Sequence, residues 1–296
     1  MDKIMEAVPN FSEGRNPQTI EMLAECFRAR DHVKMLDYSA DKDHNRSVFT
    51  VIGEPDALKE AVITAAGVAV SRIDLTKHQG QHPRMGALDV LPFIPIKNCT
   101  IDDADKTAKE TGKALAELYQ LPIFLYERSA SLPNRENLSD IRRGEFEGMA
   151  DKMKGANWKP DFGPSTIHKT AGVTAVGARM PLIAFNINLG TDKLDIAKAI
   201  AKLIRHSNGG FRYIKAMGVM LKERNIVQVS MNVTDYTQTS LYRVFETVKM
   251  EALRYGVSVV GSELIGLSPL MALMDCAAYY LQLEQFSAEQ VLETRL

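Results

Sequence analysis

The stretch IKAMGVMLKERNIVQVSMNV, residues 214–233, decides how the second half of this 296-residue chain folds. It contains two apolar runs, 214–221 and 226–233, with the polar turn Glu223-Arg224-Asn225 between them. Two such runs joined by a short polar turn are typical of a β-hairpin. We therefore expect two antiparallel strands in the middle of this half.

Helices and strands are predicted on both sides of this hairpin. Before it, residues 182–189 favour a strand, and Thr191 is expected to cap a helix whose apolar residues recur at helical spacing. After it, a second helix runs through Leu241 to Ala252, and residues 257–261 favour a strand. Ser268-Pro269 is expected to begin the last long helix. The order β-α-β-β-α-β is that of the split βαβ motif.

The first half has the same order. Strands are predicted at residues 3–8, 33–37, 47–53 and 87–96, and helices at 16–30 and 55–73. Asn16-Pro17 is a helix start with a capping residue and a first-turn proline. Pro92 and Pro95 suggest that the fourth strand lies at an edge or contains a bulge. A further helix, begun by a capping box at Thr100, and a strand at 122–126 follow.

The sequence therefore predicts an α+β protein made of two sequential split-βαβ (ferredoxin-like) α/β sandwich subdomains, residues 1–178 and 179–296. Each is expected to have an antiparallel sheet with helices on one face. Residues 128–170 interrupt this order with several Pro and Gly residues and the single Trp158. One helix is expected near 138–149, and the rest is a functional segment or a linker.

Composition excludes some classes of protein. The chain is 45% hydrophobic and 25% charged, as in ordinary globular proteins. Its 36 Lys and Arg balance 37 Asp and Glu, which argues against a general nucleic-acid binder. Neither a signal peptide nor a membrane span is recognisable. Three cysteines, Cys26, Cys99 and Cys276, form no CxxC pair, so we expect buried, reduced thiols and a cytoplasmic location.

The densest polar cluster is KHQGQHPRMG, residues 77–86, on a predicted loop between a helix and a strand. A histidine in such a loop can accept and donate protons near neutral pH. The alternative is that His78 and His82 are two exposed loop residues without a role. Their spacing of four would suit zinc only on a helix, which Gly80 and Pro83 oppose, so no metal is expected.

Two other clusters are candidate binding sites. Residues 161–172 combine Gly, Ser, Phe and His and could line a ligand cleft, or could be a Gly/Pro linker. No phosphate-binding glycine motif is present. Asp37 and Arg46 lie at a strand and the loop after it. They are either a solvated pair or, if the arginine is buried, a group that binds a carboxylate.

Several phrases of the sequence, in order along nearly the whole chain, resemble the glutamate formimidoyltransferase family. The phrases are VPNFSEG (8–14), HQG with HPRMGALDV (78–90), PDFGP (160–164), LIAFNINL (182–189), and VGS (260–262) with Leu267 and Pro269.

The resemblance implies transfer of the formimino group from N-formimino-L-glutamate to N5 of tetrahydrofolate, giving 5-formimidoyltetrahydrofolate and L-glutamate in histidine degradation. The alternative is formyl transfer from 5-formyltetrahydrofolate to glutamate, a folate-salvage reaction. Tetrahydrofolate is then a co-substrate. The family also suggests a homodimer, and a separate cyclodeaminase would act on the product, without nucleic-acid or membrane partners.

The resemblance also implies roles for single residues. The histidine of the HPRMG phrase is the family's catalytic one, which assigns that role to His82 and a supporting one to His78. Asp37 and Arg46 are placed where they could bind the cationic amidine and a carboxylate of the donor. The folate-binding segment of the family corresponds to Gly163, Pro164, Ser165, Thr166, Ile167, His168, Lys169, Thr170, Ala171 and Gly172.

A rival interpretation is a non-catalytic ligand- or RNA-binding module, because split βαβ sheets often serve that way. It would require exposed stacking aromatics and a basic face. The sequence shows neither.

Overall fold

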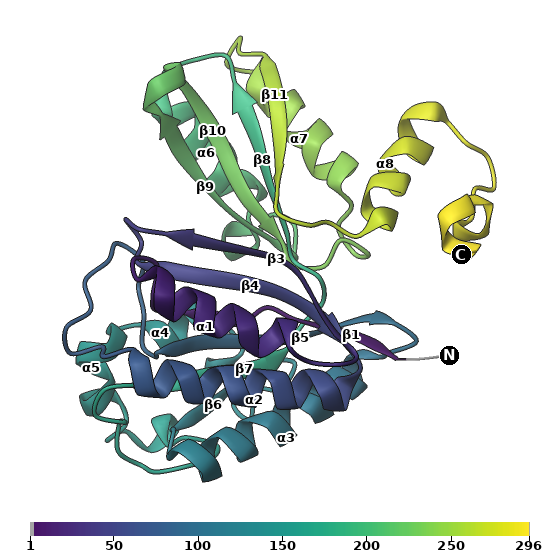
Figure 1. Ribbon diagram of the computed structural model, residues 1–296. Coiled ribbons are helices and arrows are strands. Elements are labelled where there is room, and N and C mark those ends of the chain that lie inside the picture. Colours follow the sequence, from purple (N-terminus) through teal and green to yellow (C-terminus); the bar gives the residue numbers. More distant parts are fainter. Residues whose placement is uncertain (1–2, 296) are drawn as a thin grey trace. The chain divides into compact units, whose positions relative to one another are not determined.

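A computed structural model describes residues 3–295 of the chain. The chain divides into two compact units, one ending at Arg179 and one beginning at Met180 (Figure 1). We describe each unit by itself.

The first unit is built on the predicted split βαβ motif. Its elements are β1 (Ile4–Ala7), α1 (Pro17–Arg28), β3 (Val33–Asp41), β4 (Arg46–Gly53), α2 (Pro55–Arg72) and β5 (Leu88–Lys97). These strands pair antiparallel in the order β3-β4-β1-β5, and the short β2 (Asn10–Phe11) continues β1 between β4 and β5. Helix α1 begins as expected, because the Asn16 side chain accepts hydrogen bonds from the N–H groups of Gln18 and Thr19.

The first sheet is larger than the predicted motif, and it is mixed. After β5 the chain forms α3 (Ile101–Tyr119), with the expected capping box at Thr100, and then β6 (Ile123–Glu127) and β7 (Thr174–Ala178). Strand β7 lies between β5 and β6 and is parallel to both. The expectation of a purely antiparallel sheet is therefore wrong here. The α3 connection from β5 to β6 and the connection from β6 to β7 through residues 128–173 allow the parallel pairing, since a parallel strand needs a crossover of a dozen or more residues.

Strand β5 is an inner strand, so the prolines at 92 and 95 do not mark an edge. The pairing of β1 with β5 shifts register beside Pro95, between Ile4 and Met5. Of the two alternatives, an edge or a bulge, the bulge is therefore correct. Proline has no N–H to donate, so it is tolerated where the hydrogen-bond ladder is irregular.

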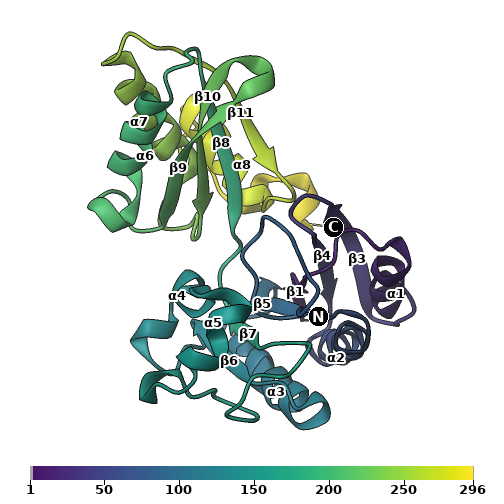
Figure 2. The same ribbon diagram turned by 90° about the vertical axis from the view of Figure 1, so that its left-hand side faces the viewer.

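Both faces of this sheet are covered near β5, β6 and β7. The main core packs α1, α2 and α3 against one face and includes Phe11, Phe27, Phe49 and Phe93. A smaller core on the other face joins Val90, Phe124 and Tyr126 of the strands to Ile141 and Met149. Figure 2 shows α3 and the short helices α4 (Leu138–Arg142) and α5 (Glu145–Lys152) on opposite sides of the sheet.

Residues 128–170 are therefore a packed part of the first unit. The single helix expected near 138–149 is divided into α4 and α5, because Arg143, with a ψ of 125°, is not helical and Gly144 has a φ of 92°. That backbone conformation is one that glycine adopts readily.

The second unit confirms the prediction from the hairpin. Its elements are β8 (Ile183–Leu189), α6 (Leu194–Ile204), β9 (Ile214–Leu221), β10 (Ile226–Val233), α7 (Leu241–Leu253), β11 (Val259–Ile265) and α8 (Leu270–Leu281). The sheet is antiparallel in the order β11-β8-β10-β9. The hairpin turns at Asn225, whose φ is 48°. The cap at Thr191 is wrong: Lys193 precedes α6, and the Thr191 hydroxyl accepts its N–H instead.

Short 3-10 helices complete the secondary structure that the model describes. They are Pro133–Arg135, Ala156–Trp158, His206–Asn208, Lys222–Arg224, Ala288–Gln290 and Leu292–Arg295.

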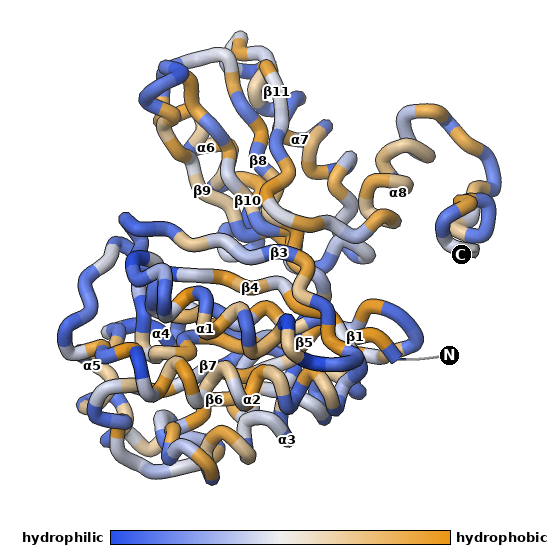
Figure 3. Tube along the Cα trace, viewed as in Figure 1, coloured by the Kyte–Doolittle hydropathy of each residue, from blue (hydrophilic) through white to orange (hydrophobic). Residues whose placement is uncertain are grey.

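Hydropathy follows this architecture (Figure 3). Apolar residues recur along both the strands and the helices, whereas hydrophilic residues gather in connections such as the turn between β3 and β4. Among residues 3–295, no helix is both long and apolar enough to cross a membrane. Cys26, Cys99 and Cys276 are free thiols, but they are partly rather than fully buried.

Candidate active site

The loop that carries both predicted histidines is fixed at several points. It connects α2 to β5. At its start the Leu75 N–H donates to the carbonyl of Thr170, at 2.9 Å. Further along, the Gln81 N–H donates to the carbonyl of Asp43, at 3.1 Å. A Cβ at Gly80 would lie 2.3 Å from the carbonyl oxygen of His44, so only glycine allows this approach to the β3–β4 turn. The loop is therefore held against that turn.

His82 is partly buried in this loop, and its ring makes no hydrogen bond to any residue that the structure describes. The His44 ring lies edge-on to it, with ring centroids 6.3 Å apart. Burial lowers the pKa of His82 to about 4, and the positive charges of Arg46 and Arg142 contribute; Asp89 opposes them. The imidazole is thus neutral at pH 7, with both ring nitrogens available to a ligand.

Arg46 begins β4 and is mostly buried beside His82. It donates a hydrogen bond to the side-chain oxygen of Asn10 on β2, which is 4% exposed. Its Nε has no hydrogen-bond partner among residues 3–295 and is shielded from solvent. Burial and the charge of Arg142 lower the pKa of Arg46. The charge of Arg46 therefore acts on His82, and the arginine is mostly buried, which is the condition under which it could bind a carboxylate.

Asp89 and Arg142 form a buried ion pair near the same histidine. An Nη2 atom of Arg142 lies 2.7 Å from the Asp89 carboxylate, and the two side chains are 14% and 4% exposed. The other carboxylate oxygen accepts the N–H of Met85 at 2.7 Å, in the His82 loop. Asp89 thus links the loop to the end of α4.

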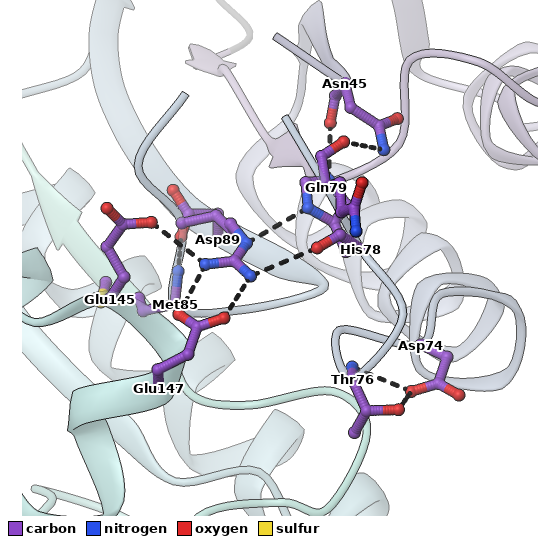
Figure 4. Close-up of polar contacts among 10 residues, drawn as sticks. Asn45, Asp74, Thr76, His78, Gln79, Met85, Asp89, Glu145 and Glu147 are labelled. Atoms are coloured by element: carbon purple, nitrogen blue, oxygen red, sulfur yellow. Dashed lines mark hydrogen bonds and ion pairs between the residues drawn. The ribbon is translucent and has the colours of Figure 1, made fainter. Parts of the chain in front are cut away.

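His78 supports the loop through both ring nitrogens (Figure 4). Its Nδ1 accepts a hydrogen bond from Nε of Arg84 at 3.2 Å, so in the neutral ring Nε2 carries the proton and donates to the carbonyl of Asn45 at 2.9 Å. Arg84 is 8% exposed and also contacts the carboxylates of Glu145 and Glu147 at the start of α5. Burial lowers the pKa of His78, which favours this neutral tautomer.

The segment from Gly163 to Gly172 runs alongside the histidine loop. Ala87 donates its N–H to the carbonyl of Ala171 at 2.9 Å, and Gly172 forms an antiparallel bridge with Gly86. His168 turns inward on its own segment, where its Nδ1 accepts the N–H of Ala171 at 3.0 Å. The exposed members are Gly163, Ser165, Thr166 and Lys169; the partly buried ones are Pro164, Ile167, His168 and Thr170; Ala171 and Gly172 are buried.

Asp161, just before this segment, is structural. Its carboxylate accepts the N–H of Leu125 at 2.8 Å and pairs with Arg135, also at 2.8 Å. The Asp161 and Arg135 side chains are 10% and 3% exposed. This buried pair fixes the backbone from which the Gly163–Gly172 segment starts.

The remaining predicted site residue is Asp37. It is exposed on β3, opposite Thr50 of β4. Side chains alternate along a strand, so Asp37, Thr50 and Arg46 share one face of the sheet. Within the described residues, no hydrogen bond or ion pair joins Asp37 to Arg46 or His82.

Sequence reasoning missed three residues of the site: Asn10, which contacts Arg46, and Asp89 and Arg142, whose charges act on His82. The first two stand inside the VPNFSEG and HPRMGALDV phrases that carried the resemblance, so they could have been found there. Arg142 lies in an ordinary charged helix and gives no signal. Among residues 3–295, no three His, Cys, Asp or Glu side chains are grouped as they would be to hold a metal ion.

Comparison with known proteins identifies the family. Residues 4–179 match the formiminotransferase domain, N-terminal subdomain, and residues 184–294 match the formiminotransferase domain. The glutamate formimidoyltransferase of Streptococcus pyogenes serotype M1 is 53% identical, over 100% of this chain and 99% of that protein. That of Thermoplasma acidophilum is 41% identical, over 99% and 97%. The chain also matches 56% of the Rattus norvegicus formimidoyltransferase-cyclodeaminase, at 41% identity. The chain therefore belongs to the formiminotransferase family.

Proposed function

We propose that this protein is a glutamate formimidoyltransferase, which moves the formimino group of N-formimino-L-glutamate to N5 of tetrahydrofolate. Two full-length relatives carry the name glutamate formimidoyltransferase. The observation that supports the chemistry is a partly buried, neutral imidazole at His82 with neither nitrogen hydrogen-bonded to a residue that the structure describes.

The reaction needs one group that both accepts and donates a proton. N5 of tetrahydrofolate attacks the formimino carbon and forms a new N–C bond, giving a tetrahedral intermediate. The neutral imidazole of His82 accepts the proton that N5 loses. It then donates that proton to the glutamate nitrogen as the bond from that nitrogen to the formimino carbon breaks. General acid–base help of this kind typically accelerates a reaction by about 10²–10⁴-fold.

The binding roles follow from charge and position. Arg46, beside His82, is suited to a carboxylate of the donor, and Asp37, on the same sheet face, to the cationic amidine. The segment from Gly163 to Gly172 runs along the histidine loop and offers exposed backbone and the side chains of Ser165 and Thr166 to the folate.

The remaining parts of the proposal rest on the family resemblance. Tetrahydrofolate is the co-substrate and no metal takes part. The protein is a cytoplasmic homodimer, and a cyclodeaminase acts on its product. Formyl transfer from 5-formyltetrahydrofolate is not favoured, since the relatives are named for formimidoyl transfer.

The test is replacement of His82 in an assay with formiminoglutamate and tetrahydrofolate. We expect His82→Ala to lower kcat by about 10²–10⁴-fold without loss of structure, and added imidazole to restore part of the rate. His32→Asn is a matched control: His32 is exposed and in a left-handed conformation that Asn tolerates, and this variant should stay fully active. Full activity of His82→Ala would remove His82 from the mechanism.

A further inference from the structure

The side chains around His82 include two buried guanidinium groups with unused hydrogen-bonding capacity. Arg46 and Arg142 come from β4 and from the end of α4. In each, Nε is buried without a hydrogen-bond partner within residues 3–295. A buried polar group without a partner costs free energy, more so when it is charged, so two such groups at one place call for an explanation.

The two arginines are bound by side chains that lie close together, next to residues 89 and 90 of β5. Arg46 donates to Asn10, which pairs across the sheet with Val90. Arg142 pairs with Asp89, the preceding residue of the same strand. The register shift between β2 and β5 at this point leaves Asp89 without a partner on β2, and such a bulge can turn a side chain toward a site.

Charge at this place is not balanced. Asp89 is one carboxylate, and its two oxygens already accept the Met85 N–H and the Arg142 guanidinium. Arg46 is bound only by the neutral Asn10 side chain within the part of the chain described. The charge of Asp41 also acts on Arg46, but that carboxylate is exposed and accepts the N–H groups of Asp43 and His44. Two guanidinium groups therefore share one buried carboxylate, and their excess positive charge acts on the His82 ring.

We propose that Arg142 and Arg46 together bind the α-carboxylate of the formimino donor. This inference rests on the proposed function and adds a binding residue, Arg142, and the part of the substrate that it recognises. A carboxylate is planar and accepts paired N–H groups from a guanidinium in a fork geometry, which is why arginine serves such sites.

Both substrates carry carboxylates, and their covalent structures show which of these can reach the two arginines. In formiminoglutamate the α-carboxylate stands on the carbon that bears the leaving nitrogen, so it must lie next to the group that protonates that nitrogen. The glutamate tail of tetrahydrofolate is separated from N5 by the aminobenzoyl group. A site adjoining the His82 imidazole is therefore matched to the donor.

A carboxylate bound by the two arginines would also change the pKa of His82. The groups whose charges act on this ring are Arg46, Arg142, Asp89 and His44. An added negative charge at the arginines offsets the two that lower the pKa of the imidazole. The donor thus raises the pKa of His82 and makes its imidazole a stronger base for the proton that N5 loses, although burial, the largest cause of the lowered pKa, remains.

The first experiment is steady-state kinetics of Arg142→Met. We expect kcat/KM for formiminoglutamate to fall about 10- to 100-fold, mainly through KM, with KM for tetrahydrofolate unchanged. Arg143→Met is a matched control, because the adjacent Arg143 is 80% exposed and pairs only with Asp140 among the described residues. An Arg142→Met protein with normal KM for the donor would refute the inference.

The second experiment uses donors that lack one carboxylate. N-formimino-γ-aminobutyrate lacks the α-carboxylate, and N-formimino-2-aminobutyrate lacks the other. The unmodified protein should lose about 10- to 100-fold in kcat/KM with the first donor, and Arg142→Met should lose little more. If the unmodified protein uses the first donor as well as formiminoglutamate, the inference is wrong, even if Arg142→Met does not fold.

The pH profiles give an independent readout. For the unmodified protein, the acid-side pKa should be higher in kcat, which reports the substrate complex, than in kcat/KM, which reports the free enzyme. Arg142→Met should reduce that difference. A raised KM for tetrahydrofolate with an unchanged KM for the donor would assign the arginines to the folate tail and overturn the proposal. Absence of any formimino transfer by the unmodified protein would instead refute the proposed function.

Discussion

The protonation state of His82 can be measured directly. Burial and the charges of Arg46 and Arg142 lower its pKa to about 4 in the free protein. At pH 7 only about one ring in a thousand is then protonated, whereas an unperturbed histidine of pKa about 6.5 would be protonated in about a quarter of the molecules. An unperturbed histidine would change its protonation state between pH 8 and pH 5, whereas His82 would not, so a titration over this range distinguishes the two cases.

The assay is an NMR titration of the histidine ring signals between pH 8 and pH 5, with the His82 signal assigned by its loss in His82→Gln. We expect that signal to show no midpoint in this range. The acid limb of kcat/KM should likewise lie below pH 5, because it reports the free enzyme.

Removing one positive charge provides the control. Arg46→Met takes away one of the two charges that oppose protonation, so the pKa of His82 should rise and its midpoint should move toward the measured range. A midpoint between pH 6 and 7 in the unmodified protein would show that the ring is solvated and would refute the reasoning about its environment.

Two further predictions concern the scaffold, both measured by thermal or chemical denaturation. Asp161→Asn should destabilise the protein by about 3 kcal/mol, because it leaves the Arg135 guanidinium buried without its carboxylate. The control is Asp151→Asn, at a carboxylate that is 82% exposed, which should change stability by less than about 0.5 kcal/mol. Equal effects of the two substitutions would contradict the role given to burial. Gly172→Ala should lower the free energy of unfolding by about 2 kcal/mol or more, since Gly172 has a φ of 72° and a Cβ there would lie 2.1 Å from a backbone carbonyl oxygen. The control is Gly148→Ala, inside α5 with open space around it, which should stabilise the protein by about 0.5–1 kcal/mol. If Gly172→Ala is as stable as the unmodified protein, the Gly163–Gly172 segment can adapt and the prediction is wrong.

Local signals in the sequence predicted most elements correctly. The hairpin at 214–233 and the helix start at Asn16-Pro17 depend on residues a few positions apart, whose preferred backbone conformations agree with the fold. The errors occurred where distant residues decide the conformation. Strand β7 lies parallel between β5 and β6, and the two crossovers, α3 between β5 and β6 and residues 128–173 between β6 and β7, allow this pairing, which the residues of β7 do not indicate.

The same division holds for the candidate site. The sequence by itself determined the chemistry that is available, because the HPRMG phrase supplied His82 and the strand after the β3–β4 turn supplied Arg46. Only the tertiary structure brought Arg142 to Asp89, 53 positions earlier in the chain, and placed both arginines beside His82. Burial and proximity of charges are properties of the packed chain, so the pKa of an imidazole and the binding capacity of a guanidinium cannot be deduced from their neighbours in sequence.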